Sequence, residues 1–401
     1  MEVVGKYGKA VVYNDTVEQE AISQIINLLN QPMAENAHVR VMPDIHAGAG
    51  CVIGYTAKLT DYVVPNLIGV DIGCSVSAVS MQTVNLDAFN SRFEKLIPVG
   101  RNIHKTPIYH ISDFAVDHIK EFEYVCKVIG MDIDYMKCSL GTLGGGNHYS
   151  EVDVDSKGDW WFTLHTGSRN FGLRIAKYFQ DKAQKVDTSS QIEKIKCEYS
   201  GKDIENKIKE LNENAYKPKG LEWLEPADRE NYLTFMRIAQ NYAKANHNVI
   251  IRTVLPESYL RYSPSEYGRM HIHSYFTSHN YIDMYNGIIR KGAVSAQINE
   301  LFLIPLNMRD GTLFCRGKGN EEWNFSAPHG AGRLMSRRSA KENLSFKDYE
   351  KSMEGVYSTC VSKSTLDESP DAYKNADEIK KYIEPTATIL DHWKPVWNYK
   401  G

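Results

Sequence analysis

Short apolar runs typical of β-strands occur at both ends of the chain and enclose a long helical middle. Residues 1–80 alternate such runs with Gly and Pro, and residues 19–30 among them have the spacing of an amphipathic helix. Strand-like runs return after residue 255, whereas residues 171–250 are mostly typical of helices. Because strands must lie side by side in a sheet, we expect mixed sheets assembled from both ends, in one continuous α+β body over residues 1–401.

One helical stretch differs from the rest of the middle. Residues 187–220 are rich in Lys and Glu of alternating charge, a composition typical of a solvated helical face. We expect a peripheral helical insertion there, with a binding role as the less favoured alternative. Residues 115–137 have a mixed helical pattern, and Ser345 with Asp348 has the spacing of a helix start.

The composition is that of a globular protein. Of the 401 residues, 42% are hydrophobic and 24% are charged, which excludes general disorder. The N-terminus lacks a signal-peptide pattern and no stretch approaches about 18 consecutive apolar residues, so we expect a cytoplasmic protein with no membrane partner. Seven scattered cysteines without a CxxC pair are typical of reduced thiols. With a net charge of −3, binding of a polyanion would require a local basic patch.

Polar residues beside glycines mark places where chemistry could occur. Asp71 and Cys74 follow an apolar run and could bind one metal ion, although a capping Asp and a buried Cys are the alternative. Asn147 and His148 follow three glycines, which could wrap a phosphate or only form a turn. His165 ends a strand-like run, where a lone histidine is more often structural.

The densest chemistry lies late in the chain. His329 begins the sequence His-Gly-Ala-Gly-Arg, which ends on Arg333 and precedes a predicted helix. Such a segment could supply a nucleophile, a flexible backbone, a helix N-terminus for an anion and an Arg fork for phosphate. His279 adds an imidazole upstream. His271 and His273 share one face of a predicted strand, and we expect them to be structural because no third ligand is obvious nearby.

Together, one Asp, one Cys and three His could bind divalent transition metal ions. Thiolate and imidazole favour borderline-soft ions, a carboxylate admits Mn²⁺, and one thiolate can bridge two ions. His329 would then be free to attack a nucleotide phosphorus. Three familiar signatures are missing, namely GxxxxGK[ST], GxGxxG after the first strand, and KxDG. Any nucleotide is therefore bound in a different way.

Ten short motifs follow one another along the chain: PDIHAGAG, GVDIGC, GTLGGGNH, HTGSRN, SHNY, RKGA, NMRDG, GKGN, SAPHGAGR and the terminal YKG. In this order, and over nearly the whole chain, they closely resemble the motifs of the RtcB family of RNA-splicing ligases. The resemblance implies an RtcB-like fold and a ligase that joins RNA with a 3′-phosphate or 2′,3′-cyclic phosphate to RNA with a 5′-hydroxyl, in tRNA splicing or RNA repair. It also implies GTP and two Mn²⁺ ions as cofactors.

Carried over motif by motif, the resemblance implies roles for individual residues. One manganese would be held by Asp71, Cys74 and His148. The second would be held by Cys74, His165 and His279. GMP would be taken by His329 through a phosphoramidate bond. The implied guanylate pocket comprises Asn147, His148, Tyr149, Ser150, Glu151, His279, Asn280, Pro305, Leu306, Asn307, Met308, Thr312, His329, Gly330, Ala331, Gly332 and Lys400.

Candidates for contact with RNA or phosphate lie beside these residues. Arg169 and Arg333 are the two that we expect to serve this purpose. Asp44 and His46 are expected at the rim of the site or behind its ligands. A basic run could line an RNA groove or could form only an exposed helix face; it consists of Arg333, Arg337, Arg338 and Lys341.

The sequence departs from the family pattern at two places near the implied site. Ser75 follows the metal cysteine where many members carry glycine, and residues 305–308 read PLNM rather than PGSM. These changes could alter the RNA-end preference or the nucleotide contacts, whereas all five ligands and the nucleophile are present. A metal-dependent RNA phosphoesterase, which needs no GTP, and a non-catalytic factor that binds damaged RNA or ribosomes are the alternatives. The need for an activating protein partner stays open.

Overall fold

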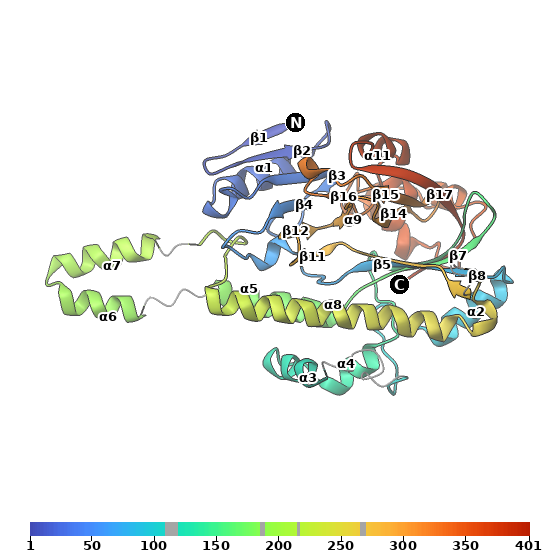
Figure 1. Cartoon of the computed structure of the whole chain (residues 1–401), viewed down its shortest axis with the longest axis horizontal. Helices are drawn as coiled ribbons and strands as arrows, with labels where there is room; N and C mark the ends of the chain where they lie inside the picture. Colours follow the sequence, from blue (N-terminus) through green and yellow to red (C-terminus); the bar gives the residue numbers. More distant parts are fainter. Residues whose placement is uncertain (109–118, 185–188, 215–216, 265–269) are drawn as a thin grey trace.

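Two large sheets form the centre of the molecule, and a long helix passes along one side of them (Figure 1). The structure is a computed structural model that describes residues 1–108, 119–184, 189–214, 217–264 and 270–401. The first four residues of the predicted helical stretch 115–137, and parts of the predicted insertion 187–220, lie outside the described residues. The described part confirms the predicted α+β class.

The six-stranded sheet combines segments from both ends of the sequence, as predicted. Its strand order is β1–β2–β3–β4–β12–β11, and only β2 and β3 pair in parallel. The strands are β1 (Glu2–Val4), β2 (Lys9–Val12), β3 (Val39–His46), β4 (Ile53–Lys58), β11 (Asn280–Asp283) and β12 (Ile288–Lys291).

The seven-stranded sheet is antiparallel throughout, in the order β10–β5–β7–β6–β17–β15–β14. It includes two strands from the middle of the sequence, next to the C-terminal strand. The strands are β5 (Ser75–Met81), β6 (Tyr149–Val154), β7 (Trp160–Thr166), β10 (Ser274–Ser278), β14 (Leu301–Asn307), β15 (Gly311–Gly317) and β17 (Ala387–Lys400). Two further pairs are β13 (Ala293–Ser295) with β16 (Ser326–Pro328) and β8 (Tyr262–Pro264) with β9 (Met270–Ile272).

Most helices occupy positions that the sequence pattern predicts. Helix α1 matches the predicted amphipathic stretch, and α10 begins after Ser345, whose hydroxyl accepts a hydrogen bond from the backbone N–H of Asp348 at 3.3 Å. The helices are α1 (Gln19–Leu29), α2 (Leu86–Leu96), α3 (Ile119–Val128), α4 (Ile133–Ser139), α5 (Asn170–Ala183), α6 (Ser189–Glu198), α7 (Lys202–Asn214), α8 (Pro226–Val254), α9 (Arg337–Asn343), α10 (Phe346–Ser352) and α11 (Ala376–Tyr382). Among the described helices, none has the length and apolar character needed to cross a membrane.

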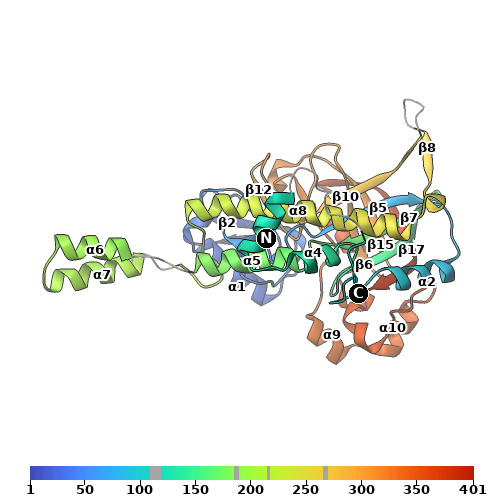
Figure 2. The same cartoon turned by 90° about the horizontal axis from the view of Figure 1, so that it is seen from below.

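Helices α6 and α7 form a hairpin that stands away from the body in both views (Figures 1 and 2). The apolar residues of the hairpin are only half-buried, whereas most of its charged residues are exposed. Helices α6 and α7 therefore bury a small apolar surface, mainly by packing against each other. The assignment of this segment as an insertion in one catalytic body stays a prediction.

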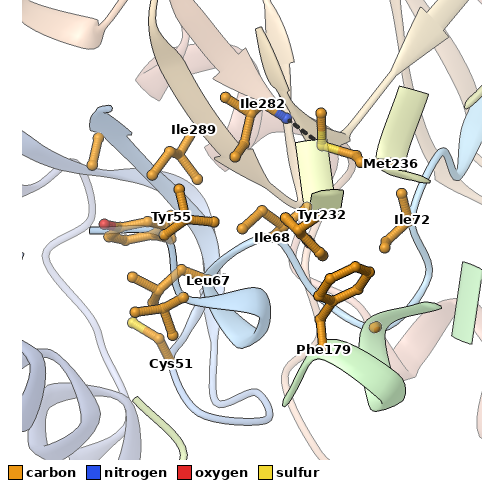
Figure 3. Close-up of a cluster of buried hydrophobic side chains, with 14 of the residues drawn as sticks. Cys51, Tyr55, Leu67, Ile68, Ile72, Phe179, Tyr232, Met236, Ile282 and Ile289 are labelled. Atoms are coloured by element: carbon orange, nitrogen blue, oxygen red, sulfur yellow. Dashed lines mark hydrogen bonds between the residues drawn. The ribbon is translucent and has the colours of Figure 1, made fainter. Parts of the chain in front are cut away.

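A hydrophobic core joins the six-stranded sheet to α5 and α8 (Figure 3). Ile289 of β12, Phe179 of α5 and Met236 of α8 are all buried in it. Ile68 and Ile72 belong to the same core and flank a segment that leads from β4 into β5. Because both isoleucines are fully buried, the core fixes the loop from which the first candidate ligands project.

Candidate metal centre and nucleotide cavity

The five candidate metal ligands all lie at or beside strand ends. Cys74 directly precedes β5, His148 directly precedes β6, and His165 lies in β7 between these two strands. His279 joins β10 to β11, and its backbone N–H donates to the carbonyl of Cys74 at 3.1 Å. Asp71 forms a tight turn with Cys74, whose N–H donates to the Asp71 carbonyl at 3.1 Å. Strand pairing therefore brings together residues that are up to 208 positions apart.

The side chains of these residues form two groups of three that share Cys74. Its Sγ lies 3.5 Å from Nε2 of His148 and 3.2 Å from Nε2 of His165. Nε2 of His148 lies 3.2 Å from Oδ2 of Asp71, and Nε2 of His165 lies 3.4 Å from Nε2 of His279. The ligand atoms within each group lie within 4.8 Å of one another. Within the described ranges, no comparable group forms around the predicted structural pair of histidines on and beside β9.

The chemistry of this donor set fits a transition metal ion. Burial lowers the pKa of His165 and His279 well below the ordinary value, so both rings are neutral and present lone pairs. Burial, followed by the nearby Asp71 carboxylate, raises the pKa of the Cys74 thiol. A bound cation would displace that proton, because metal ligation requires the thiolate. Sulfur, imidazole nitrogen and carboxylate oxygen together suit borderline ions and still admit Mn²⁺.

Two glycines allow the ligand loops to approach their neighbours closely. Gly73 has φ +79°, and a Cβ there would lie 3.1 Å from the Cα of Gln240 in α8. Gly144 has φ +95°, and a Cβ there would lie 2.0 Å from Nη1 of Arg169 and 2.3 Å from Nδ1 of His148. The first of the three consecutive glycines therefore packs against protein, because only glycine leaves room for the His148 ring.

His329 lies next to the metal cluster, and its ring is held by Asp44. The ring centroids of His329 and His279 are 5.0 Å apart. Oδ2 of Asp44 lies 2.6 Å from Nδ1 of His329 and accepts the backbone N–H of the same residue at 3.1 Å. A Cβ on Gly332 would lie 2.4 Å from the carbonyl oxygen of Asp44, so the glycine loop packs directly on this aspartate. Asp44 thus contacts the candidate nucleophile, whereas the sequence placed it only at the rim or behind the ligands.

Two buried lysines hold the segment around Asp44. Nζ of Lys374 donates to the carbonyls of Pro43 and Ile45, at 2.9 and 3.1 Å, on either side of the aspartate. Lys291 acts in the same way further along, with Nζ donating to the carbonyls of residues 49 and 51. Burial lowers the pKa of Lys291 to about 8. The PDIHAGAG segment is therefore fixed by two lysines that are distant from it in the sequence.

A cavity of about 300 Å³ runs from His165 of the metal cluster past His329 to Lys400. Most residues of the implied guanylate pocket line it, namely Asn147, Tyr149, Glu151, Pro305, Leu306, Asn307, Met308, His329, Gly330, Ala331, Gly332 and Lys400. The others do not line it, namely His148, Ser150, His279, Asn280 and Thr312. Asn280 instead spans two loops: its Nδ2 donates to the Asp71 carbonyl at 3.1 Å, and its Oδ1 accepts the Gly292 N–H at 2.8 Å.

The far end of the cavity contains a buried ionic network that the sequence did not reveal. Glu368 accepts hydrogen bonds from Nζ of Lys400 and from the hydroxyl of Tyr373, both at 2.6 Å, and pairs with Arg337. Burial opposes ionisation of Glu368, but the charges of Lys400 and Arg337 outweigh it and lower its pKa to about 2. Lys400 is only 8% exposed, so the penultimate lysine is held in the cavity wall. Only Lys400 could have indicated this network from the sequence. A lysine placed in the cavity would be buried, and a buried ammonium group requires a counter-ion.

The arginines expected to contact RNA mainly contact protein. Arg169 donates to Oγ1 of Thr142 and to the carbonyl of Gly100, both at 2.8 Å, and does not line the cavity. Arg333 lines the cavity, but it donates to the hydroxyl of Tyr373 at 3.1 Å and to a backbone carbonyl at residue 335. The other members of the basic run are paired with acids: Arg337 with Asp367 and Glu368, Lys341 with Asp367, and Arg338 with Glu342.

A helix follows the glycine loop after His329, as the sequence predicts, although the loop does not lead into it directly. Helix α9 begins at Arg337, and its cap is Ser336, whose hydroxyl accepts the N–H of Ser339 at 3.2 Å. Residues 334–336 separate the loop from the helix. The N-terminus of α9 is therefore separate from the glycine loop, whose Gly332 packs on Asp44.

Comparisons with known proteins identify the family of the chain. A family model described as tRNA-splicing ligase RtcB matches residues 24–121 and 127–401. The chain belongs to the RtcB family. An RNA-splicing ligase RtcB of Escherichia coli K12 is 29% identical, over 96% of this chain and 95% of its own length. RNA-splicing ligase RtcB1 from another Escherichia coli strain gives the same figures, and the tRNA-splicing ligase RtcB of Nanoarchaeum equitans is 25% identical over 91% of this chain and 88% of its own. The RtcB family resemblance read from the motifs is thereby confirmed.

Proposed function

We propose that this chain is an RNA ligase that joins a 3′-phosphate or 2′,3′-cyclic phosphate end to a 5′-hydroxyl end, with GTP and two Mn²⁺ ions. One observation carries the proposal: both ligand groups, the candidate nucleophile and a cavity of about 300 Å³ adjoin one another. The names of the relatives, RNA-splicing and tRNA-splicing ligases, support it. Action in the cytoplasm and a single catalytic body over residues 1–401 belong to the same proposal.

Two metal ions would share the Cys74 thiolate. Asp71 and His148 would complete the first site, and His165 and His279 the second. When bound, the ions would neutralise charge on the phosphates of the nucleotide and the RNA end.

His329 is the group that would take GMP. With its carboxylate on Nδ1, Asp44 holds the proton there and leaves the Nε2 lone pair free. Nε2 attacks the α-phosphorus of GTP, so that an N–P bond forms, the bond to the β-phosphate oxygen breaks and pyrophosphate leaves. A 2′,3′-cyclic phosphate, where present, is first hydrolysed, so that the bond between phosphorus and the 2′-oxygen breaks and a 3′-phosphate forms. An RNA 3′-phosphate oxygen then attacks the phosphorus of the GMP on His329 and releases the histidine. Attack by the 5′-hydroxyl on the RNA phosphorus expels GMP and forms the phosphodiester.

The cavity would hold the guanylate between His329 and Lys400. Burial, followed by repulsion from Asp153, raises the pKa of Glu151 well above the ordinary value. The raised pKa favours the protonated carboxyl of Glu151, which can donate a hydrogen bond to an acceptor on a ligand. Asn147 adds an exposed amide to the lining of the cavity. Arg169 and Arg333 stay candidates for supporting the RNA end through their loops, since their guanidinium groups are engaged with protein.

The test is covalent labelling with GTP that carries ³²P at the α-phosphate, in the presence of Mn²⁺. Wild type is compared with His329→Ala and with His271→Ala, a half-buried histidine outside the cluster. An acid-labile label on the wild type and the control, but not on His329→Ala, supports the proposal. Absence of label on the wild type in the presence of Mn²⁺ overturns it.

A second assay separates ligation from its alternatives. RNA carrying a 2′,3′-cyclic phosphate is supplied together with RNA carrying a 5′-hydroxyl, with and without GTP. Joined product that requires GTP supports a ligase. Opening of the cyclic phosphate without joining would favour the phosphoesterase, and RNA binding without any turnover would favour the non-catalytic factor.

A further inference from the structure

Helix α8 passes behind the metal cluster and presents two adjacent buried polar residues that the proposed mechanism leaves unused. Asn246 is 0% exposed and His247 is 1% exposed. Burying a polar side chain costs free energy unless its hydrogen bonds to water are replaced by hydrogen bonds within the protein. Both residues direct those contacts at the backbone that carries the metal ligands.

Asn246 links two ligand-bearing loops through one amide. Its Oδ1 accepts the backbone N–H groups of residues 141 and 142, at 2.8 and 3.2 Å. Its Nδ2 donates to the carbonyl of residue 142, to the hydroxyl of Thr166 and to the carbonyl of residue 167, at 3.1, 3.1 and 3.2 Å. The first loop leads through the glycines to His148, and the second directly follows His165.

His247 joins β5 to the same end of β7. Its Nε2 lies 3.1 Å from the carbonyl of Thr166 and 3.0 Å from Oγ of Ser75, and its Nδ1 lies 2.7 Å from Oγ of Ser77. One tautomer satisfies every contact: Nε2–H donates to the carbonyl and to Ser75, while the Ser77 hydroxyl donates to Nδ1. The Ser75 hydroxyl donates onward to the Gly73 carbonyl at 3.1 Å. Residues on both sides of Cys74 are thereby fixed.

We propose that Asn246 and His247 are positioning residues that set the spacing of Cys74, His148 and His165 for metal binding. The inference rests on the proposed function, because it requires metal at this cluster. The contacts of His247 fall on the immediate neighbours of Cys74 and His165, so a shift of its ring changes the distance between these ligands. Ser75, which departs from the glycine of many RtcB proteins, supplies one of those contacts.

The test is Co²⁺ binding to the full chain, followed by the thiolate-to-metal and ligand-field absorption bands and by competition with Mn²⁺. Asn246→Asp keeps the shape of the side chain but turns a donor towards the carbonyls of residues 142 and 167 into an acceptor. Tyr242→Phe is the matched control, since it removes one buried hydrogen bond of α8, from its hydroxyl to the Met136 carbonyl at 2.6 Å. That bond does not involve a ligand-bearing segment, and thermal unfolding is measured on every variant.

We expect Asn246→Asp to weaken Co²⁺ binding at least tenfold and to change the absorption bands, as loss of an outer partner of metal ligands does. Tyr242→Phe should lose stability but keep its affinity within about twofold of wild type. Ser75→Ala, a milder change at the His247 contact, guards against failure of Asn246→Asp to fold and should change the bands in the same direction. Folded Asn246→Asp or Ser75→Ala with wild-type affinity and bands would overturn the inference. Failure of the wild type to bind either ion would instead overturn the proposed metal centre, and the inference with it.

Discussion

The two ends of the cavity satisfy their polar groups in opposite ways. At the metal end, one thiol and three imidazoles face one another, and burial keeps His165 and His279 neutral. At the far end, the carboxylate of Glu368 is matched by Lys400 and Arg337. A cluster of uncharged donors beside the single carboxylate of Asp71 has room for a positive charge, whereas a cluster of matched charges does not. The first end is therefore suited to bind cations, and the second to hold the C-terminal strand against the cavity.

The largest effect is expected from removing the ligand that both metal groups share. Cys74→Ala should abolish binding of both ions and lose more than about 100-fold in metal affinity, because loss of an outer partner alone costs 10- to 100-fold. His148→Ala should remove only one ion per chain. Metal content after gel filtration measures both, with Cys197→Ala, an exposed thiol of α6, as the control. Two ions retained by Cys74→Ala would contradict the shared-ligand arrangement.

The second largest effect should come from a variant that impairs the nucleophile His329 without changing metal binding. Asp44→Asn can turn an amide N–H towards Nδ1 of His329 and so favour the wrong tautomer. We expect labelling by GTP to slow by about 10²- to 10⁴-fold, as when the carboxylate behind a catalytic imidazole is neutralised. Metal content should not change, since Asp44 contacts none of the ligands' donor atoms. A parallel fall in metal content would show that the aspartate acts on the cluster rather than on His329.

Glu368→Gln should lower the stability of the protein, because it removes the buried negative charge that pairs with Lys400 and Arg337. The pKa of about 2, against an ordinary value of 4.5, corresponds to on the order of 3 kcal/mol of folding free energy at pH 7. Because the pKa is lower in the folded state, this contribution is complete above pH 4.5 and decreases as the pH falls towards 2. Urea unfolding should therefore show a difference from wild type that shrinks between pH 7 and pH 3.

Glu342→Gln is the control for that measurement. It breaks an exposed pair with Arg338 at 2.8 Å and should change stability by less than about 1 kcal/mol. A difference for Glu368→Gln that did not depend on pH would attribute its effect to shape rather than to charge.

The same contrast explains which residues could be predicted from the sequence. The metal ligands and His329 stand in short motifs that the RtcB family shares, so each could be located without knowing what lies beside it. The contact between Asp44 and His329 spans 285 positions, and Glu368 stands in no motif that singles it out. Such partners become visible only when strand order is known, since pairing of β13 with β16 is what brings His329 over β3.

Local sequence patterns predict helix boundaries less well where tertiary contacts determine the backbone conformation. The spacing predicted α1 and the start of α10 correctly, because capping and amphipathic spacing act within a few residues. The helix predicted after Arg333 is present as α9, but residues 334–336 separate it from the glycine loop, whose Gly332 packs on Asp44. The order of the strands in the two sheets could not be read from the runs themselves.

The smallest effect should come from Asn307, where the chain departs from the usual RtcB pattern. Its Nδ2 donates to Oδ2 of Asp310 at 2.8 Å, and its Oδ1 accepts the backbone N–H groups of Arg309 and Asp310 at 3.0 and 2.9 Å. Although it lines the cavity, the side chain has little left to offer a nucleotide. Asn307→Ala should therefore cost about 1 kcal/mol of stability but raise the KM for GTP less than about threefold.

Asn147 provides the comparison, because its side chain is exposed and makes no hydrogen bond within the described part of the chain. If this amide binds the nucleotide, Asn147→Ala should raise the KM about tenfold, the equivalent of about 1.4 kcal/mol. The dependence of the labelling rate on GTP concentration measures both variants. A larger KM effect at Asn307 than at Asn147 would mean that nucleotide binding opens the turn at Asp310. In that case, a side chain that is fully hydrogen-bonded in the free protein could still bind the nucleotide.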